Sequence, residues 1–205
     1  MSEAEPGSRE EIEEFRRRQI SRMPILGATA ENRGLLEESY RRQLGAFEPH
    51  VGIGRYLFGS RPSLADFAWC GQFSQLATDP TPMRIMREIA PFTDHWTRRL
   101  DDASGVEGAW HPREQALSGL AEALLGIAGE LYLPFLAANA DAFARGLPRL
   151  ELEVWGLPYA LSPFKYQVKC LEQLREKFAG LDAADRTALR PLLERTGCWA
   201  HLAAI

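Results

Sequence analysis

Residues 57–72 read LFGSRPSLADFAWCGQ, and the fold class is inferred first from this segment. Ser63 and Asp66 stand three residues apart before an apolar run, the pattern of a helix N-capping box with Asp in place of the usual Glu or Gln. The spacing predicts that the Ser63 hydroxyl accepts from the Asp66 backbone N–H, and that the Asp66 carboxylate accepts from the Ser63 N–H. A catalytic Ser–Asp pair is the weaker interpretation, because the spacing is that of a cap.

The helix that begins at Ser63 is expected to be central and the most buried. Small residues at positions 65, 68 and 71 would let a neighbouring helix approach closely. The residues that share one face at helical spacing are Leu64, Phe67, Ala68, Gly71 and Gln75.

Two helices are predicted before this stretch. The first follows an N-cap at Ser8, carries Ile12, Phe15 and Met23 at helical spacing, and stops before Pro24. The second runs from about residue 31 to 50 and is ended by glycines 52 and 54. Its predicted buried stripe is Leu36, Tyr40, Leu44, Phe47 and Val51.

After the quoted stretch, residues 79–82 are expected to form a loop, followed by a short helix over 83–89. Pro91 is expected to begin another helix. Its predicted inner face is Phe92, Trp96 and Leu100.

A long helical pattern covers residues 113–145 and should kink at Pro134. Residues 150–154 alternate strictly and predict a strand, with a pairing partner over 155–161 if a hairpin forms. Ser162 and Pro163 are expected to start a further helix as N-cap and first residue. A last helix is capped by Asp182 and closed by Gly197.

Composition limits the class of protein. The chain has 205 residues, 45% hydrophobic and 25% charged, so it can build one ordinary domain or two small ones and is not disordered as a whole. No apolar run reaches the roughly 18 residues that a membrane span needs, and the acidic N-terminus is not a secretory signal. A net charge of −4 argues against nucleic-acid binding by bulk electrostatics.

Cysteine and histidine usage favours a reducing, cytoplasmic compartment and no metal site. The three cysteines, Cys70, Cys170 and Cys198, are far apart and form no CxxC pair. The four histidines also lack the spacing of metal ligands.

The quoted stretch resembles the opening of the central helix in the all-α C-terminal domain of the glutathione S-transferase superfamily. In that family a Ser or Thr and an Asp form the capping box, which here are Ser63 and Asp66. The resemblance implies an all-α helix bundle over residues 8–105. Residues 106–205 are then a helical extension packed on it, as in some longer bacterial members, with one short strand or hairpin near 149–161. Residues 1–7 are expected to be a disordered N-terminus.

The resemblance also implies glutathione as co-substrate, bound in the family by a thioredoxin-like domain of about 80 residues that precedes the helical domain. No strand-rich segment precedes Ser8, so the family's glutathione-binding and catalytic residues cannot be carried over onto this chain. The chain alone is therefore expected to have little or no transferase activity. The partners that the resemblance implies are a thioredoxin-like domain and a second copy in a homodimer. From charge and hydropathy, no nucleic acid and no membrane is expected as a partner.

Four residues are candidates for an apolar substrate pocket, namely Met23, Tyr40, Trp69 and Phe73, although a helical aromatic stripe more often forms core. Cys70 is more simply a buried, inert cysteine than a reactive thiol. Arginines 16–18 are more simply a solvated helix face than a contact for glutathione carboxylates or for a partner. Trp155 and Tyr159 either close a cleft or pack the extension, and the sequence does not choose between these.

Two functions remain open from the sequence. The first is the helical, substrate-binding half of a glutathione-conjugating transferase. The second is a non-catalytic helical module that binds a protein partner or a small apolar ligand.

Overall fold

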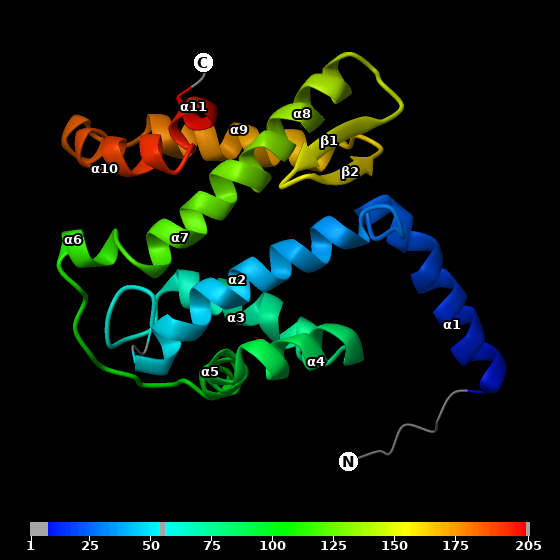
Figure 1. The fold of residues 1–205 in the computed structure, drawn as a ribbon, viewed down its shortest axis with the longest axis horizontal. Helices are drawn as coiled ribbons and strands as arrows, with labels where there is room; N and C mark the ends of the chain where they lie inside the picture. Colours follow the sequence, from blue (N-terminus) through cyan, green and yellow to red (C-terminus); the bar gives the residue numbers. More distant parts are fainter. Residues whose placement is uncertain (1–7, 54–55, 204–205) are drawn as a thin grey trace.

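The computed structural model describes residues 8–53 and 56–203, and it is mostly helical, with one two-stranded sheet in that range. The expectations for residues 1–7 and for Gly54 lie outside the described residues. Two layers of helices lie one above the other, and α1 projects away from both (Figure 1). The all-α class is confirmed at this level.

The lower layer of Figure 1 is built from four helices, α2 (Arg33–Ile53), α3 (Leu64–Leu76), α4 (Pro80–Ile89) and α5 (Pro91–Asp101). Its core is aromatic: Phe47 lies edge-on to Phe73 with ring centroids 5.0 Å apart, and Trp96 packs on the same Phe47 ring at 5.5 Å. Leu120 of the next layer belongs to the same core cluster, so the layers share part of their core.

The upper layer holds the second half of the chain and has its own core around Leu136, Leu171 and Leu193. After α6 (Arg113–Ala116), its elements are α7 (Leu120–Ile127), η2 (Ala128–Tyr132), α8 (Leu133–Ala144), β1 (Leu150–Val154), β2 (Leu157–Leu161), α9 (Lys165–Ala179), α10 (Ala183–Arg195) and α11 (Trp199–Leu202). β1 and β2 pair antiparallel with Leu150 opposite Leu161, which confirms the predicted hairpin.

The long helix of the upper layer departs from α geometry just before Pro134, where a kink was predicted. Proline lacks an N–H and its ring crowds the carbonyl four residues earlier, and here the turn over η2 widens to π geometry just before it. The helix also begins later than expected, because Gly119, with a φ of +58°, separates α6 from α7.

The segment Leu120–Ala144 is long and apolar enough to cross a membrane by length and composition alone. This corrects the expectation that no such segment exists. The apolar run is interrupted by Glu122, Glu130 and Asp141, yet its mean hydropathy stays high enough for a membrane span. A core helix of a soluble protein meets the same criteria, and this one packs against α2 through α7 and against α9 through α8.

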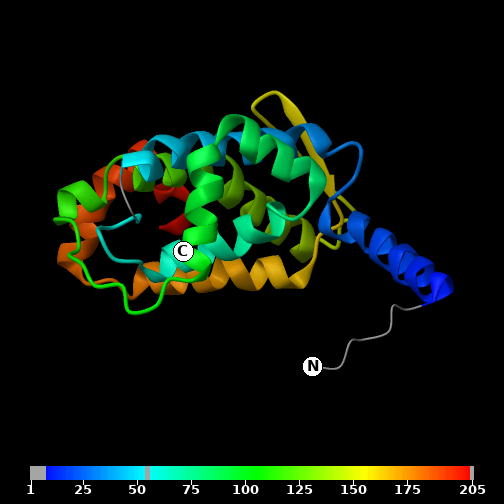
Figure 2. The same cartoon turned by 90° about the horizontal axis from the view of Figure 1, so that it is seen from below.

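The first helix is an arm. α1 (Arg9–Arg22) is capped by Ser8 and Glu11 in a capping box, and it ends at Arg22, as predicted from Pro24. η1 (Met23–Leu26), a turn of 3-10 helix, joins it to the rest. Figures 1 and 2 show α1 pointing away from both layers, and none of its residues is buried.

Two predicted helix starts were wrong, one because of a local cap and the other because of a distant side chain. The expected loop at 79–82 is the start of α4. The Asp79 carboxylate accepts a hydrogen bond from the Thr81 N–H, and Pro80, which has no N–H, loses no hydrogen bond in the first turn of a helix. The helix expected at Ser162 begins instead at Lys165. The buried Asn139 side chain pairs with both the N–H and the carbonyl of Phe164 and holds that residue extended.

Three burial predictions also need correction. Phe92 is 60% exposed, because the Glu48 carboxylate accepts from the N–H groups of Phe92 and Thr93 and turns Thr93 inward instead. The buried stripe of α2 begins at Leu35, and Leu36 is partly exposed. The predicted face of α3 from Leu64 to Gln75 exists, yet it is exposed, so α3 is not the most buried helix.

Candidate functional site

The Ser63–Asp66 pair forms the predicted capping box and no catalytic arrangement. The Asp66 carboxylate is fully buried and accepts from the N–H groups of Leu57 at 2.9 Å and Ser63 at 2.8 Å. The Ser63 hydroxyl donates to the same carboxylate and accepts from the Asp66 N–H. These partners occupy the polar groups of the pair and tie the loop before α3 to its first turn.

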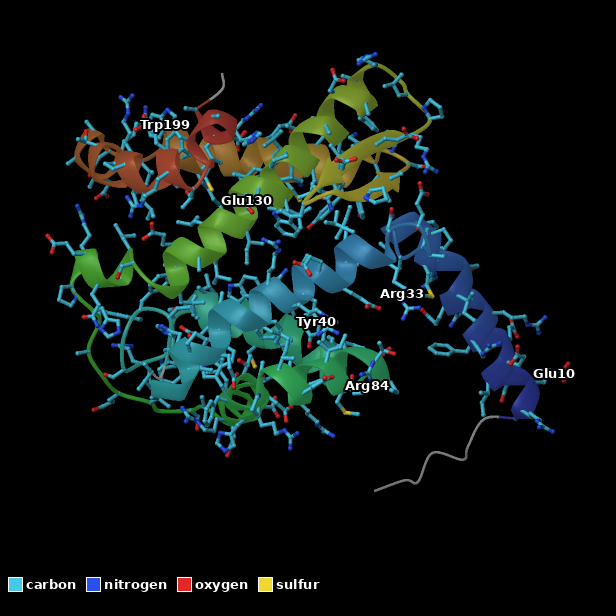
Figure 3. All side chains as sticks on the ribbon, viewed as in Figure 1. Glu10, Arg33, Tyr40, Arg84, Glu130 and Trp199 are labelled. Carbon is cyan, nitrogen blue, oxygen red and sulfur yellow. The ribbon has the colours of Figure 1, made fainter. Side chains whose placement is uncertain are left out.

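The structure does not bring the four candidate pocket residues together. Tyr40 and Phe73 are buried in the lower core, where their rings pack edge to face. Figure 3 shows Tyr40 within the lower layer, and its hydroxyl donates to the Pro82 carbonyl. Met23 is partly exposed at a hollow beside η1. Of the four, only Trp69 lines the apolar pocket that lies between the layers.

That pocket has a volume of about 590 Å³, which suits a small organic molecule. One wall comes from α2 and α3 of the lower layer, and the other from α7, η2 and α8 above, with Tyr159 of β2 at the end. Its lining residues are Leu35, Leu36, Ser39, Gln43, Trp69, Gln72, Leu124, Ile127, Ala128, Leu131, Tyr132, Phe135 and Tyr159.

No side chain in this lining carries a formal charge at neutral pH. The polar groups are the hydroxyl of Ser39, the indole N–H of Trp69, the amides of Gln43 and Gln72, and the phenols of Tyr132 and Tyr159. Burial raises the pKa of both phenols, so they remain neutral hydrogen-bond donors. The pocket therefore offers apolar walls and a few neutral donors and acceptors.

The apolar helix Leu120–Ala144 forms one wall of this pocket. Only 22% of the residues in its most apolar stretch are buried, although a core helix is normally covered on most sides. Leu124, Ile127 and Leu131 instead face the open pocket. Apolar surface that stays accessible in this way favours the binding of an apolar molecule.

Trp155, in the turn between β1 and β2, contacts both layers. Its indole N–H donates to Glu130 at 2.7 Å, and the Arg42 guanidinium lies 4.1 Å from its ring centroid. Trp155 has a φ of +54°, a left-handed conformation that is uncommon for a bulky residue, and Gly156 completes the two-residue turn. The sequence left open whether Trp155 and Tyr159 close a cleft or pack the extension. Tyr159 lines the pocket, whereas Trp155 fixes the hairpin to its neighbours.

Two buried asparagines position the hairpin, and the sequence analysis missed both. The Asn32 amide donates to the carbonyls of Gly27 and Ala160 and accepts from the Ala160 N–H at 2.8 Å. Asn139 pairs in the same way with Phe164. An Asn within the apolar run of α8 was the available signal, because a buried amide needs partners.

The remaining candidates have structural surroundings. Cys70 and Cys198 are buried, and burial raises the pKa of both thiols, which makes them poor nucleophiles. Arg16 pairs with Glu13 on the exposed surface of α1. Over residues 8–53 and 56–203, no three side chains of His, Cys, Asp or Glu gather as a set of metal ligands.

Comparisons with known proteins identify no relative. No protein-family model, no curated protein and no solved structure matches the chain. The functional inference therefore rests on the chemistry of the pocket.

Proposed function

We propose that this protein binds a neutral, mainly apolar small molecule in the pocket between its two layers. The single observation that supports this most is the chemistry of the pocket walls. The pocket has a volume of about 590 Å³, its lining carries no formal charge, and most of the lining side chains are apolar. A charged ligand would lose its hydration there without gaining an ionic partner. A neutral ligand with one or two hydrogen-bonding groups would find the glutamine amides and tyrosine hydroxyls.

The size of the pocket sets the expected affinity. A ligand of about 20 non-hydrogen atoms at about 0.3 kcal/mol per atom gives a Kd in the tens of micromolar. Tighter binding would require a ligand that satisfies the amides of Gln43 and Gln72 as well as filling the apolar walls.

The more specific proposal is that the chain is the helical, substrate-binding half of a protein of the glutathione S-transferase superfamily, soluble and cytoplasmic. The capping box of α3 and an apolar pocket beside Trp69 support it. The sheet in the described residues is a two-stranded hairpin, so the glutathione-binding residues of the family have no counterpart there. The hydrogen-bond donor that stabilises the glutathione thiolate would come from a thioredoxin-like partner domain. Conjugation of a chloro-nitrobenzene by the 205-residue chain alone would refute this division of roles.

A non-catalytic binding module is the second candidate, and the same pocket supports it. The two differ in whether the chain works with a glutathione-binding domain. Retention of the chain on immobilised glutathione in the presence of a thioredoxin-like domain favours the transferase proposal, and no retention under the same conditions favours the module.

The binding proposal is tested by titration with a neutral fluorescent naphthylamine. Ile127→Trp places a large side chain in the pocket and should weaken binding at least tenfold. Ile53→Trp makes the same change at a position that is 93% exposed and should leave binding unchanged. Equal affinities of the two variants, or no binding by the unmodified chain, would contradict the proposal.

A further inference from the structure

Two apolar helix faces are left uncovered in the part of the chain that the structure describes. The first is on α1, where Ile12 is 59% and Phe15 55% exposed. The second is the outer face of α3, where Leu64 is 87% and Phe67 45% exposed. A side chain added at Gly71, on the same face, would meet no atom within 4 Å. Each face needs a partner to leave water.

The two faces match in spacing and length. Ile12, Phe15, Gln19 and Met23 are three, four and four residues apart on α1 and at its C-cap. Leu64, Phe67, Gly71 and Gln75 repeat the same spacings on α3. At 1.5 Å per residue both stripes are about 16 Å long, and the small residues Ala68 and Gly71 leave room for the larger side chains of α1.

The C-terminal ends of the two stripes already lie together. Met23 and Gln75 line one hollow, with Leu36, Leu76 and Pro82. A 3-10 turn that contains Pro24 separates α1 from the anchored Gly27, whose carbonyl accepts from Asn32. Rotation within η1 would therefore swing α1 along α3, with the two helices parallel, while every other element stays in place.

We propose that the outer face of α3 is the docking surface for α1 of the same chain, so that the projecting arm has a second, closed position. An isolated helix of 14 residues is marginal in water, and burial of its stripe would stabilise it. The short tether holds α1 near α3 at an effective concentration on the order of millimolar, well above that of a second copy in dilute solution. This proposal does not depend on the proposed function.

Disulfide trapping tests the closed position. Gln19→Cys with Gly71→Cys, in a Cys170→Ser background, should form an intramolecular disulfide on mild oxidation, detected as a faster-migrating monomer on a non-reducing gel. Arg17→Cys with Gly71→Cys is the matched control, because Arg17 lies on the opposite side of α1, and it should react at least tenfold more slowly. Equal rates for the two pairs would overturn the proposal. Disulfide-linked dimers that increase with protein concentration would overturn it too, in favour of a second copy as occupant.

Hydrogen exchange on the chain without any of these cysteine substitutions gives an independent readout. Docked α1 amides should exchange at least tenfold more slowly than in Ala68→Arg, which places a charge on the exposed α3 face without disturbing the core. Identical exchange of α1 in both proteins would contradict docking.

Discussion

At the scale of single residues, Asp66 shows how one carboxylate fixes a local fold. It is fully buried, and its partners include the N–H groups of Leu57 and Ser63 and the Ser63 hydroxyl. We predict that Asp66→Ala lowers the free energy of unfolding by about 3 kcal/mol, because it leaves buried donors without acceptors. Asp79→Ala, which removes an exposed cap, should cost only about 1 kcal/mol in the same denaturant titration. Similar losses for both variants would count against this account of Asp66.

Tyr40 is expected to lower the free energy of unfolding as the pH becomes alkaline. Burial, and then the nearby charge of Asp94, raise its pKa from 10.0 to about 12. The folded state therefore resists deprotonation, so its contribution is present below pH 10 and is lost as the pH rises from about 10 to 12. We predict that melting temperatures of the unmodified chain fall more steeply above pH 10 than those of Tyr40→Phe. The exposed Tyr166→Phe should follow the unmodified chain, and parallel curves for all three would exclude this role of Tyr40.

At the scale of elements, the hairpin depends on an anchor outside itself. A two-stranded hairpin is marginal alone, and Asn32 occupies the outer edge of β2 through both backbone groups of Ala160. We predict that Asn32→Ala costs about 3 kcal/mol and speeds hydrogen exchange at the Ala160 amide. The exposed Glu151→Ala, on the other strand, is the control and should change neither. Unaltered exchange at Ala160 in Asn32→Ala would show that the anchor is elsewhere.

Elements defined by local chemistry were predictable from the sequence, and the pocket was not. The N-cap at Ser8, the capping box at Ser63 and the irregular turn before Pro134 each depend on residues within a few positions of one another. The pocket joins Trp69 to Ile127 and Tyr159, which only the packing of two layers brings together. The predicted pocket residues Tyr40 and Phe73 have the same aromatic character as true lining residues, and the direction each one faces is decided by that packing.

At the scale of the whole molecule, the two layers meet along α2 and the helix α7–η2–α8, and their junction is both core and pocket. Leu120 joins the lower core, whereas Leu124 and Ile127 also line the open space. An ion pair that joins the layers, Arg149 with Glu31, is half exposed and contributes little to holding them together. Apolar contact along this junction and the buried hydrogen bonds between Asn32 and Ala160 hold the layers, and an apolar ligand would extend the apolar contact.

Methyl NMR of the chain saturated with the neutral naphthylamine shows where the ligand binds. We expect shift changes and ligand contacts at the methyl groups of Leu35, Leu124 and Ile127, which belong to opposite walls of one pocket. The methyl groups of Leu171 and Leu193, in the upper core, should stay unchanged. Ligand contacts confined to the exposed side chains of α1 or the outer face of α3, with the pocket methyls unshifted, would contradict the binding proposal.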